Sequence, residues 1–242
     1  EIATFHQSPI SNLQSLKDFM TQQAKTFTTQ ISKTTALNYL LHLPPGVEDG
    51  EKRPFILFLH GAGERGDDLD LIWLHGLPKV IDGDPDFPFI VASPQCPALT
   101  TWSVLVDALK ALVDELVATH PIDPSRLYLT GLSMGGYGSW NLAATYPNLF
   151  AAVAPICGGG GWFFGFPDRV VALKDTPVWA FHGAQDEIVP LSETAVLIET
   201  LHQAHGTAPI RFTIYPNLNH DSWTITYDDP ELYSWFLRQK KQ

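Results

Sequence analysis

From residue 54 onward the chain alternates short apolar runs with segments of helical spacing. Residues 55–59 form a continuous apolar run, bounded by Pro54 and Gly61. Such a run is typical of a strand that is buried on both faces. Alternation of these runs with helices is typical of a mostly parallel sheet covered by helices on both sides. The sequence therefore predicts an α/β fold.

The expected strands share apolar character and flanking Pro or Gly residues, and the expected helices carry apolar residues three or four positions apart. We expect strands at residues 26–31, 36–43, 55–59, 87–92, 126–130, 150–156, 178–181 and 210–215. We expect helices at residues 11–23, 104–118, 134–146, 192–205 and 230–237. Residues 158–176 are expected to form a loop.

Composition limits the size and the partners of the protein. The chain has 242 residues, of which 45% are hydrophobic and 17% charged, which suits one large α/β domain. We expect residues 1–24 to be an extension, left from a linker or a processed precursor. The formal net charge is −11, so we expect neither a nucleic acid nor a membrane partner. Because the chain starts at Glu1 and not at Met, we expect a processed protein or a fragment and favour a secreted or extracytoplasmic location.

The chain contains two cysteines, Cys96 and Cys157. Two cysteines do not make a disulfide framework. They can pair with each other, but we favour two buried free thiols.

A glycine-flanked serine follows one of the expected strands. Residues 131–135 read Gly-Leu-Ser-Met-Gly and match G-x-S-x-G, with a strand before them and a helix after them. The nucleophile elbow of α/β hydrolases has this strand-turn-helix placement, because the serine must project from a tight turn. The alternative is a glycine-rich turn without chemistry. The context favours Ser133 as a nucleophile in an α/β-hydrolase fold.

A serine nucleophile needs a base, and in this fold the acid and then the histidine follow the serine along the chain. Asp186 follows the strand at 178–181, and His220 follows the strand at 210–215. Glu187 is the rival of Asp186. The histidine is expected to take the serine proton, and the carboxylate to fix the tautomer of the histidine. His60 and His182 precede glycines at strand ends, and we expect them to bind loop backbone.

Two backbone N–H groups are expected to form an oxyanion hole. One is that of Met134, directly after the nucleophile, and the other that of Ala62, with Gly63 as the alternative. We expect the charged side chains beyond this loop to form ion pairs that hold it: Glu64, Arg65, Asp67 and Asp68.

Five segments of the chain together resemble a known group of enzymes. They are residues 59–67, 93–97 with Trp102, 123–136, 181–190 and 220–223. They resemble small bacterial esterases, often labelled predicted peptidases, which are related to feruloyl esterases, acetylxylan esterases and polyhydroxybutyrate depolymerases. The resemblance spans about residues 36–236. It implies a carboxylic ester hydrolase that needs no metal or other cofactor and acts on a small-molecule ester, including one linked to a polysaccharide.

The sequence constrains the substrate less than it constrains the catalytic residues. Residues 158–176 are short for a cap domain, so we expect an open site and short acyl chains. Aromatic side chains are expected to bind substrate or, alternatively, to pack on the core: Trp102, Trp162, Phe163, Phe164, Phe166 and Trp223. The rival functions are a feruloyl or acetylxylan esterase, a peptidase related to prolyl oligopeptidase, and a catalytically silent binding protein.

Overall fold

The computed structural model describes residues 24–30, 32 and 34–241, and the chain divides into two units, 1–35 and 36–242. The described residues of the first unit contain no helix or strand, so the strand expected at 26–31 is wrong for residues 26–30. The helix expected at 11–23 lies outside the described residues. No helix in the described part of the chain has the length and apolar character that crossing a bilayer requires.

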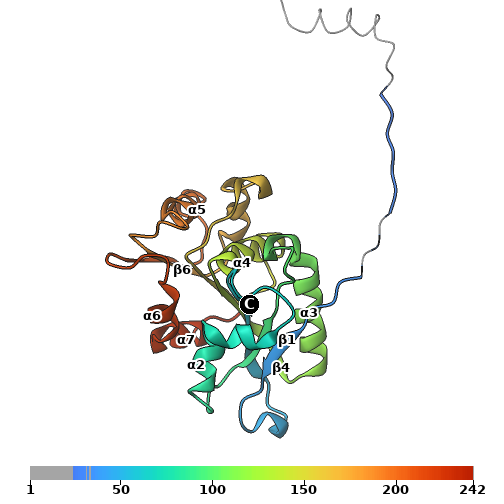
Figure 1. The fold of residues 1–242 in the computed structure, drawn as a ribbon, viewed down its shortest axis with the longest axis vertical. Helices are drawn as coiled ribbons and strands as arrows, with labels where there is room; N and C mark the ends of the chain where they lie inside the picture. Colours follow the sequence, from blue (N-terminus) through green and yellow to red (C-terminus); the bar gives the residue numbers. More distant parts are fainter. Residues whose placement is uncertain (1–23, 31, 33, 242) are drawn as a thin grey trace, which may run out of the picture. The chain divides into compact units, whose positions relative to one another are not determined.

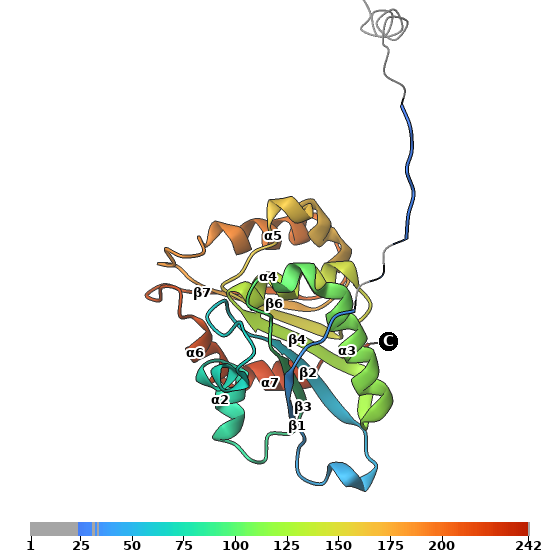
Figure 2. The same cartoon turned by 45° about the vertical axis from the view of Figure 1, so that its right-hand side comes forward.

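The second unit is built on one seven-stranded sheet, shown in Figures 1 and 2. Its strands are β1 (Tyr39–His42), β2 (Arg53–Leu59), β3 (Ile90–Pro94), β4 (Ile122–Leu132), β5 (Ala152–Ile156), β6 (Val178–Gly183) and β7 (Ile210–Tyr215). Their order across the sheet is β1-β3-β2-β4-β5-β6-β7. Only the β1–β3 pairing is antiparallel, so the expectation of a mostly parallel sheet is confirmed.

Helices cover both faces of this sheet. They are α2 (Leu77–Asp82), α3 (Val106–Thr119), α4 (Met134–Thr145), α5 (Ser192–Gln203), α6 (Trp223–Tyr227) and α7 (Pro230–Leu237). Short 3-10 turns occur at η1 (Val47–Asp49), η2 (Leu69–Leu74), η3 (Trp102–Val104), η4 (Trp162–Phe164) and η5 (Asp168–Leu173). In Figure 2, α3, α4 and α5 lie on one side of the sheet, and α2, α6 and α7 lie on the other.

The core forms two layers because side chains alternate along each strand. On β2, Leu57 and Leu59 face the layer of α3, α4 and α5, whereas Ile56 and Phe58 face the layer of α2, α6 and α7. All four side chains are buried. A strand that is buried on both faces reads as a continuous apolar run, as the sequence of β2 does.

The parallel strands place their carboxyl ends along one edge of the sheet. The loops that follow β2, β4, β6 and β7 therefore meet there, which is where α/β folds bind ligands. Residues 158–176, expected as a loop, contain only the two 3-10 turns η4 and η5. The described part of the chain thus carries no large cap over this edge, and the expected α/β-hydrolase fold is confirmed.

Candidate active site

Ser133 lies at a tight turn between β4 and α4. Its φ of 54° and ψ of −115° lie outside the regions that L-residues usually occupy, so the turn holds the serine in a strained conformation. A Cβ at Gly135 would lie 1.9 Å from the carbonyl oxygen of Leu59, and one at Gly131 would lie 2.5 Å from that of Gly135. Glycine at both positions therefore lets β2, β4 and α4 approach closely enough to form this turn.

His220 is hydrogen-bonded to both of its expected partners. Its Nε2 lies 2.9 Å from Ser133 Oγ, and its Nδ1 lies 2.7 Å from Asp186 Oδ2. An ionised carboxylate only accepts hydrogen bonds, so Nδ1 carries the proton in the neutral ring. The lone pair of Nε2 then faces the serine hydroxyl, which is the geometry a general base requires.

Asp186 is held by the backbone of the loop after β6. Its Oδ1 accepts hydrogen bonds from the N–H groups of Ile188 and Val189, both at 2.9 Å. Burial acts to raise the pKa of Asp186, but the hydrogen bonds from His220 and from these two N–H groups outweigh it and lower the pKa. The carboxylate is therefore ionised at neutral pH. Glu187, the rival acid, is exposed, and Asp186 takes the position beside His220.

His182 also contacts this carboxylate. Its Nε2 lies 3.2 Å from Asp186 Oδ2 and 2.9 Å from the carbonyl oxygen of Val189, and its Nδ1 lies 2.8 Å from Thr194 Oγ1. Both neighbours of Nε2 are acceptors, so Nε2 carries a proton. Burial lowers the pKa of His182, which favours the neutral ring. The expected backbone contact of His182 is present, whereas its contact with the acid could not be read from the sequence.

The loop after β2 exposes Ala62 and Gly63 on the same edge of the sheet. In the described part of the chain, neither the Ala62 nor the Met134 N–H donates to a protein acceptor. Met134 is the first residue of α4, where the helix dipole favours negative charge. These two N–H groups are thus available for a ligand.

Buried polar side chains form hydrogen bonds with the backbone of the loop after β2 and of its neighbours. Gln95 Nε2 donates to the carbonyl oxygens of Glu64 and Asp68, at 2.9 and 2.7 Å. His60 Nε2 accepts the Cys96 N–H at 3.0 Å, and its Nδ1 lies 2.6 Å from the Gly61 carbonyl oxygen. The expected backbone role of His60 is therefore present. Gln95 was not identified from the sequence, because a buried glutamine carries no motif of its own.

The ion pairs expected to hold this loop are present only in part: Glu64 Oε2 lies 3.7 Å from His60 Nδ1, and Glu64 Oε1 lies 3.9 Å from His75 Nε2. Arg65 donates instead to the carbonyl oxygens of Ala62 and Thr100, at 3.0 and 3.4 Å. Asp68 Oδ1 accepts the Asp70 N–H at the start of η2. Glu64 is buried beside His60; burial acts to raise its pKa, but the contact with His60 outweighs this and lowers it. For Arg65, backbone carbonyl acceptors take the place of the expected carboxylate partners, and a sequence does not show which carbonyl groups will be near.

The expected substrate-binding tryptophans lie in three different environments. Trp102 is 0% exposed and donates its indole N–H to the His60 carbonyl oxygen at 2.9 Å. It therefore supports the loop after β2 and does not bind substrate as expected. Trp162 is 74% exposed and stacks on Phe163, whose side chain is 79% exposed. Trp223 is half-buried, and its ring meets the His220 ring edge-on at 5.3 Å.

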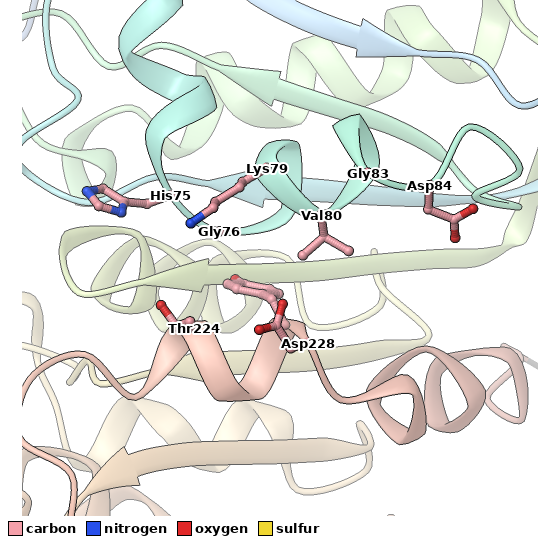
Figure 3. Close-up of a pocket in the computed structure, with 9 residues that line it drawn as sticks. His75, Gly76, Lys79, Val80, Gly83, Asp84, Thr224 and Asp228 are labelled. Atoms are coloured by element: carbon pink, nitrogen blue, oxygen red, sulfur yellow. The ribbon is translucent and has the colours of Figure 1, made fainter.

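A pocket opens between α2 and α6 (Figure 3). It has a volume of about 400 Å³. Polar and charged side chains line much of it: His75, Lys79, Asp84, Thr224 and Asp228. His75, which lines this pocket, meets the Trp223 ring edge-on with the ring centroids 6.1 Å apart, and the Trp223 ring also meets that of His220.

Comparison with known proteins gives consistent matches. The profile of the Phospholipase/Carboxylesterase family matches residues 103–229, more than half of the chain. A solved thermostable esterase is 34% identical, with a TM-score of 0.72, and the match covers 88% of this chain and 62% of that one.

Two curated relatives match shorter parts. The putative esterase NocK of Nocardia uniformis subsp. tsuyamanensis is 28% identical over 171 residues, which are 63% of this chain and 46% of the relative. Poly(3-hydroxyalkanoate) depolymerase C of Paucimonas lemoignei is 54% identical over 52 residues, 22% of this chain and 13% of the relative. The chain thus spans less than half the length of either protein.

Proposed function

This chain belongs to the phospholipase/carboxylesterase family of α/β hydrolases, and from that premise we propose that it is a serine esterase that cleaves short-chain acyl esters through Ser133, His220 and Asp186. The observation that carries the proposal is the pair of hydrogen bonds, 2.9 and 2.7 Å long, that joins the serine hydroxyl to the imidazole and the imidazole to the carboxylate.

Acylation begins with His220 taking the Ser133 proton as the serine oxygen attacks the ester carbonyl carbon. The negative oxygen that develops on the substrate accepts hydrogen bonds from the N–H groups of Ala62 and Met134. These two groups have no protein acceptor in the described residues. Asp186 stabilises the imidazolium that forms at His220.

Collapse of the tetrahedral intermediate expels the alcohol, which takes its proton from His220 Nε2. Water, activated by the same nitrogen, then attacks the acyl-enzyme and releases the acid. Because His220 protonates the alcohol, the alcohol part of the substrate lies on the His220 side of the serine oxygen.

Short acyl chains are favoured because only two 3-10 turns, η4 and η5, occupy the loop after β5, where a cap would supply a long apolar channel. The exposed ring of Trp162 and the half-buried ring of Trp223 offer apolar contacts for small groups. We propose both as substrate contacts.

A second candidate function follows from the pocket between α2 and α6. Its lining residue His75 contacts Trp223, which in turn contacts His220, and the pocket presents donors and acceptors of both charges. Such a lining suits a hydroxyl-rich alcohol. Feruloyl or acetyl esters of plant polysaccharide are therefore the second class of substrate that we propose.

A substrate panel tests these assignments. It contains p-nitrophenyl acetate, butyrate and palmitate, methyl ferulate, acetylated xylan and a prolyl peptide. We expect kcat/KM for acetate and butyrate to exceed that for palmitate. Faster cleavage of palmitate contradicts the capless site, cleavage of the peptide alone favours the peptidase alternative, and no cleavage of any substrate favours a silent binding protein.

A further inference from the structure

A third side chain lies against the acid and the base of the triad. Cys157 is the first residue after β5, and its side chain is fully buried. One ligand atom each from Cys157, Asp186 and His220 lie within 4.8 Å of one another. The mechanism proposed above does not use this thiol.

These three atoms are a thiol sulfur, a carboxylate oxygen and an imidazole nitrogen. All three are ordinary ligands of Zn²⁺. A fourth polar atom is nearby, because the Ser222 hydroxyl is fully buried beside the Cys157 thiol.

We propose that Cys157, Asp186 and His220 form an inhibitory site for a thiophilic divalent cation, with Zn²⁺ as the ion that fits best. Two anionic ligands, the thiolate and the carboxylate, neutralise the charge of the bound ion, which burial of an ion requires. Imidazole and thiolate ligands favour zinc over magnesium or calcium.

Binding at this site removes the base from the reaction. Zinc ligands lie about 2.0–2.3 Å from the ion, so two of them come to about 3.5 Å from each other. The His220–Asp186 pair, now 2.7 Å apart, must therefore open, and the hydrogen bond between them breaks. The metal takes the lone pair of Nδ1, and the Nδ1 proton moves to Nε2. With its proton on Nε2, the neutral ring has no lone pair at that nitrogen to accept the Ser133 proton, so ester cleavage stops.

The step balances with the release of one proton. Zn²⁺ and the metal-free site, with its Cys157 thiol, its Asp186 carboxylate and its His220 proton on Nδ1, give a zinc site with thiolate, carboxylate and imidazole ligands, the His220 proton on Nε2, and one free H⁺. Zinc binds a thiolate and not a thiol, so the proton that is released comes from Cys157.

Equilibrium dialysis with Zn²⁺ tests the site on the full chain. Ser133→Ala serves as the parent, so that binding is measured without any ester and stands apart from the proposed esterase activity. We expect one Zn²⁺ per chain in Ser133→Ala and in its Cys96→Ala derivative, since Cys96 is an equally buried free cysteine that lies against the loop after β2. Cys157→Ala should weaken the affinity at least about 100-fold.

Two further measurements protect the test against a variant that fails to fold. Co²⁺ added to the wild type should give a thiolate-to-metal charge-transfer band that Cys96→Ser keeps and Cys157→Ser loses. Where the wild type cleaves esters, Zn²⁺ should inhibit it and EDTA should restore it, whereas Cys157→Ser should stay active in Zn²⁺. Equal zinc affinity with and without Cys157, or no zinc binding by the parent, overturns the inference. Zinc binding through Cys157 in a chain that cleaves no ester overturns only the esterase.

Discussion

Asp186 is in contact with two imidazole rings: its Oδ2 lies 2.7 Å from His220 Nδ1 and 3.2 Å from His182 Nε2. The carboxylate that we propose to orient the catalytic base is therefore shared by two histidines. His182 is completely buried, and its Nε2 proton faces acceptors only. His182, which does not contact Ser133, thus stabilises part of the negative charge of Asp186.

Removal of this second donor should weaken the proposed esterase. His182→Leu removes the N–H group that faces Asp186 Oδ2, so the carboxylate is held less firmly and kcat/KM should fall about tenfold. His182→Gln keeps an N–H donor and should retain more of the activity. Steady-state kinetics of both variants check this, and an equal kcat/KM for wild type and His182→Leu would show that His182 only fills space.

Trp102 and Trp162 should differ sharply in what they contribute to stability. Trp102 is fully buried and holds the His60 carbonyl, so Trp102→Ala should cost about 3–5 kcal/mol in the free energy of unfolding. Trp162 is mostly exposed, so Trp162→Ala should change it by less than about 0.5 kcal/mol. Urea unfolding measures both, and a reversed order would contradict the burial described here.

Gly135 should tolerate no side chain. A Cβ there would meet the Leu59 carbonyl oxygen at 1.9 Å, and backbone on both sides prevents relief. Gly135→Ala should therefore cost more than about 3 kcal/mol or prevent folding. Gly83→Ala is the matched control, because its Cβ would have its nearest neighbour at 3.5 Å. Soluble yield and urea midpoints compare them; a stable Gly135→Ala chain would mean that β2 and α4 are further apart.

Asp123 should contribute to the loss of stability in acid. Partial burial acts to raise its pKa, but hydrogen bonds from Ser125 and Arg126 outweigh it and lower the pKa to about 2. The folded pKa lies below the ordinary value of 3.8, so the stabilisation is present above pH 3.8 and is lost as the pH falls toward 2. Solvent screening limits its size to about 1 kcal/mol.

Urea unfolding between pH 6 and pH 2 measures this contribution. Asp123→Asn should be less stable than the wild type at pH 6 and equal to it near pH 2. Glu115→Gln, which removes an exposed carboxylate on α3, is the control for the loss of one charge. A constant difference between Asp123→Asn and the wild type over the whole range would refute the shifted pKa.

Elements with a clear apolar pattern and clear stops were predictable, and two short helices were not. β7 and α7 have the expected bounds, because their patterns extend over several residues with clear stops. α2 and α6 were missed, since six and five residues carry too little periodicity to separate a helix from a loop. The strand expected at 26–31 is wrong for residues 26–30 because strand formation needs a partner, which a local pattern does not reveal.

The proximity of the three expected catalytic side chains was predictable for a related reason. In a parallel sheet, residues just beyond strand ends meet at one edge, so chain order alone brought Ser133, Asp186 and His220 together. Depth in the core is a tertiary property, so the sequence could not show that Trp102 is buried. The contact of His182 with the acid likewise depends on the path of a loop.

The central claim is that the Ser133 oxygen is the nucleophile that His220 activates, and covalent labelling tests it most directly. The wild-type chain is treated with a fluorophosphonate and digested, and mass spectrometry locates the adduct. We predict a single adduct on Ser133, absent from Ser133→Ala and slowed at least about 1,000-fold in His220→Ala. An adduct on another residue, or labelling that is unaffected by His220→Ala, would contradict the assignment.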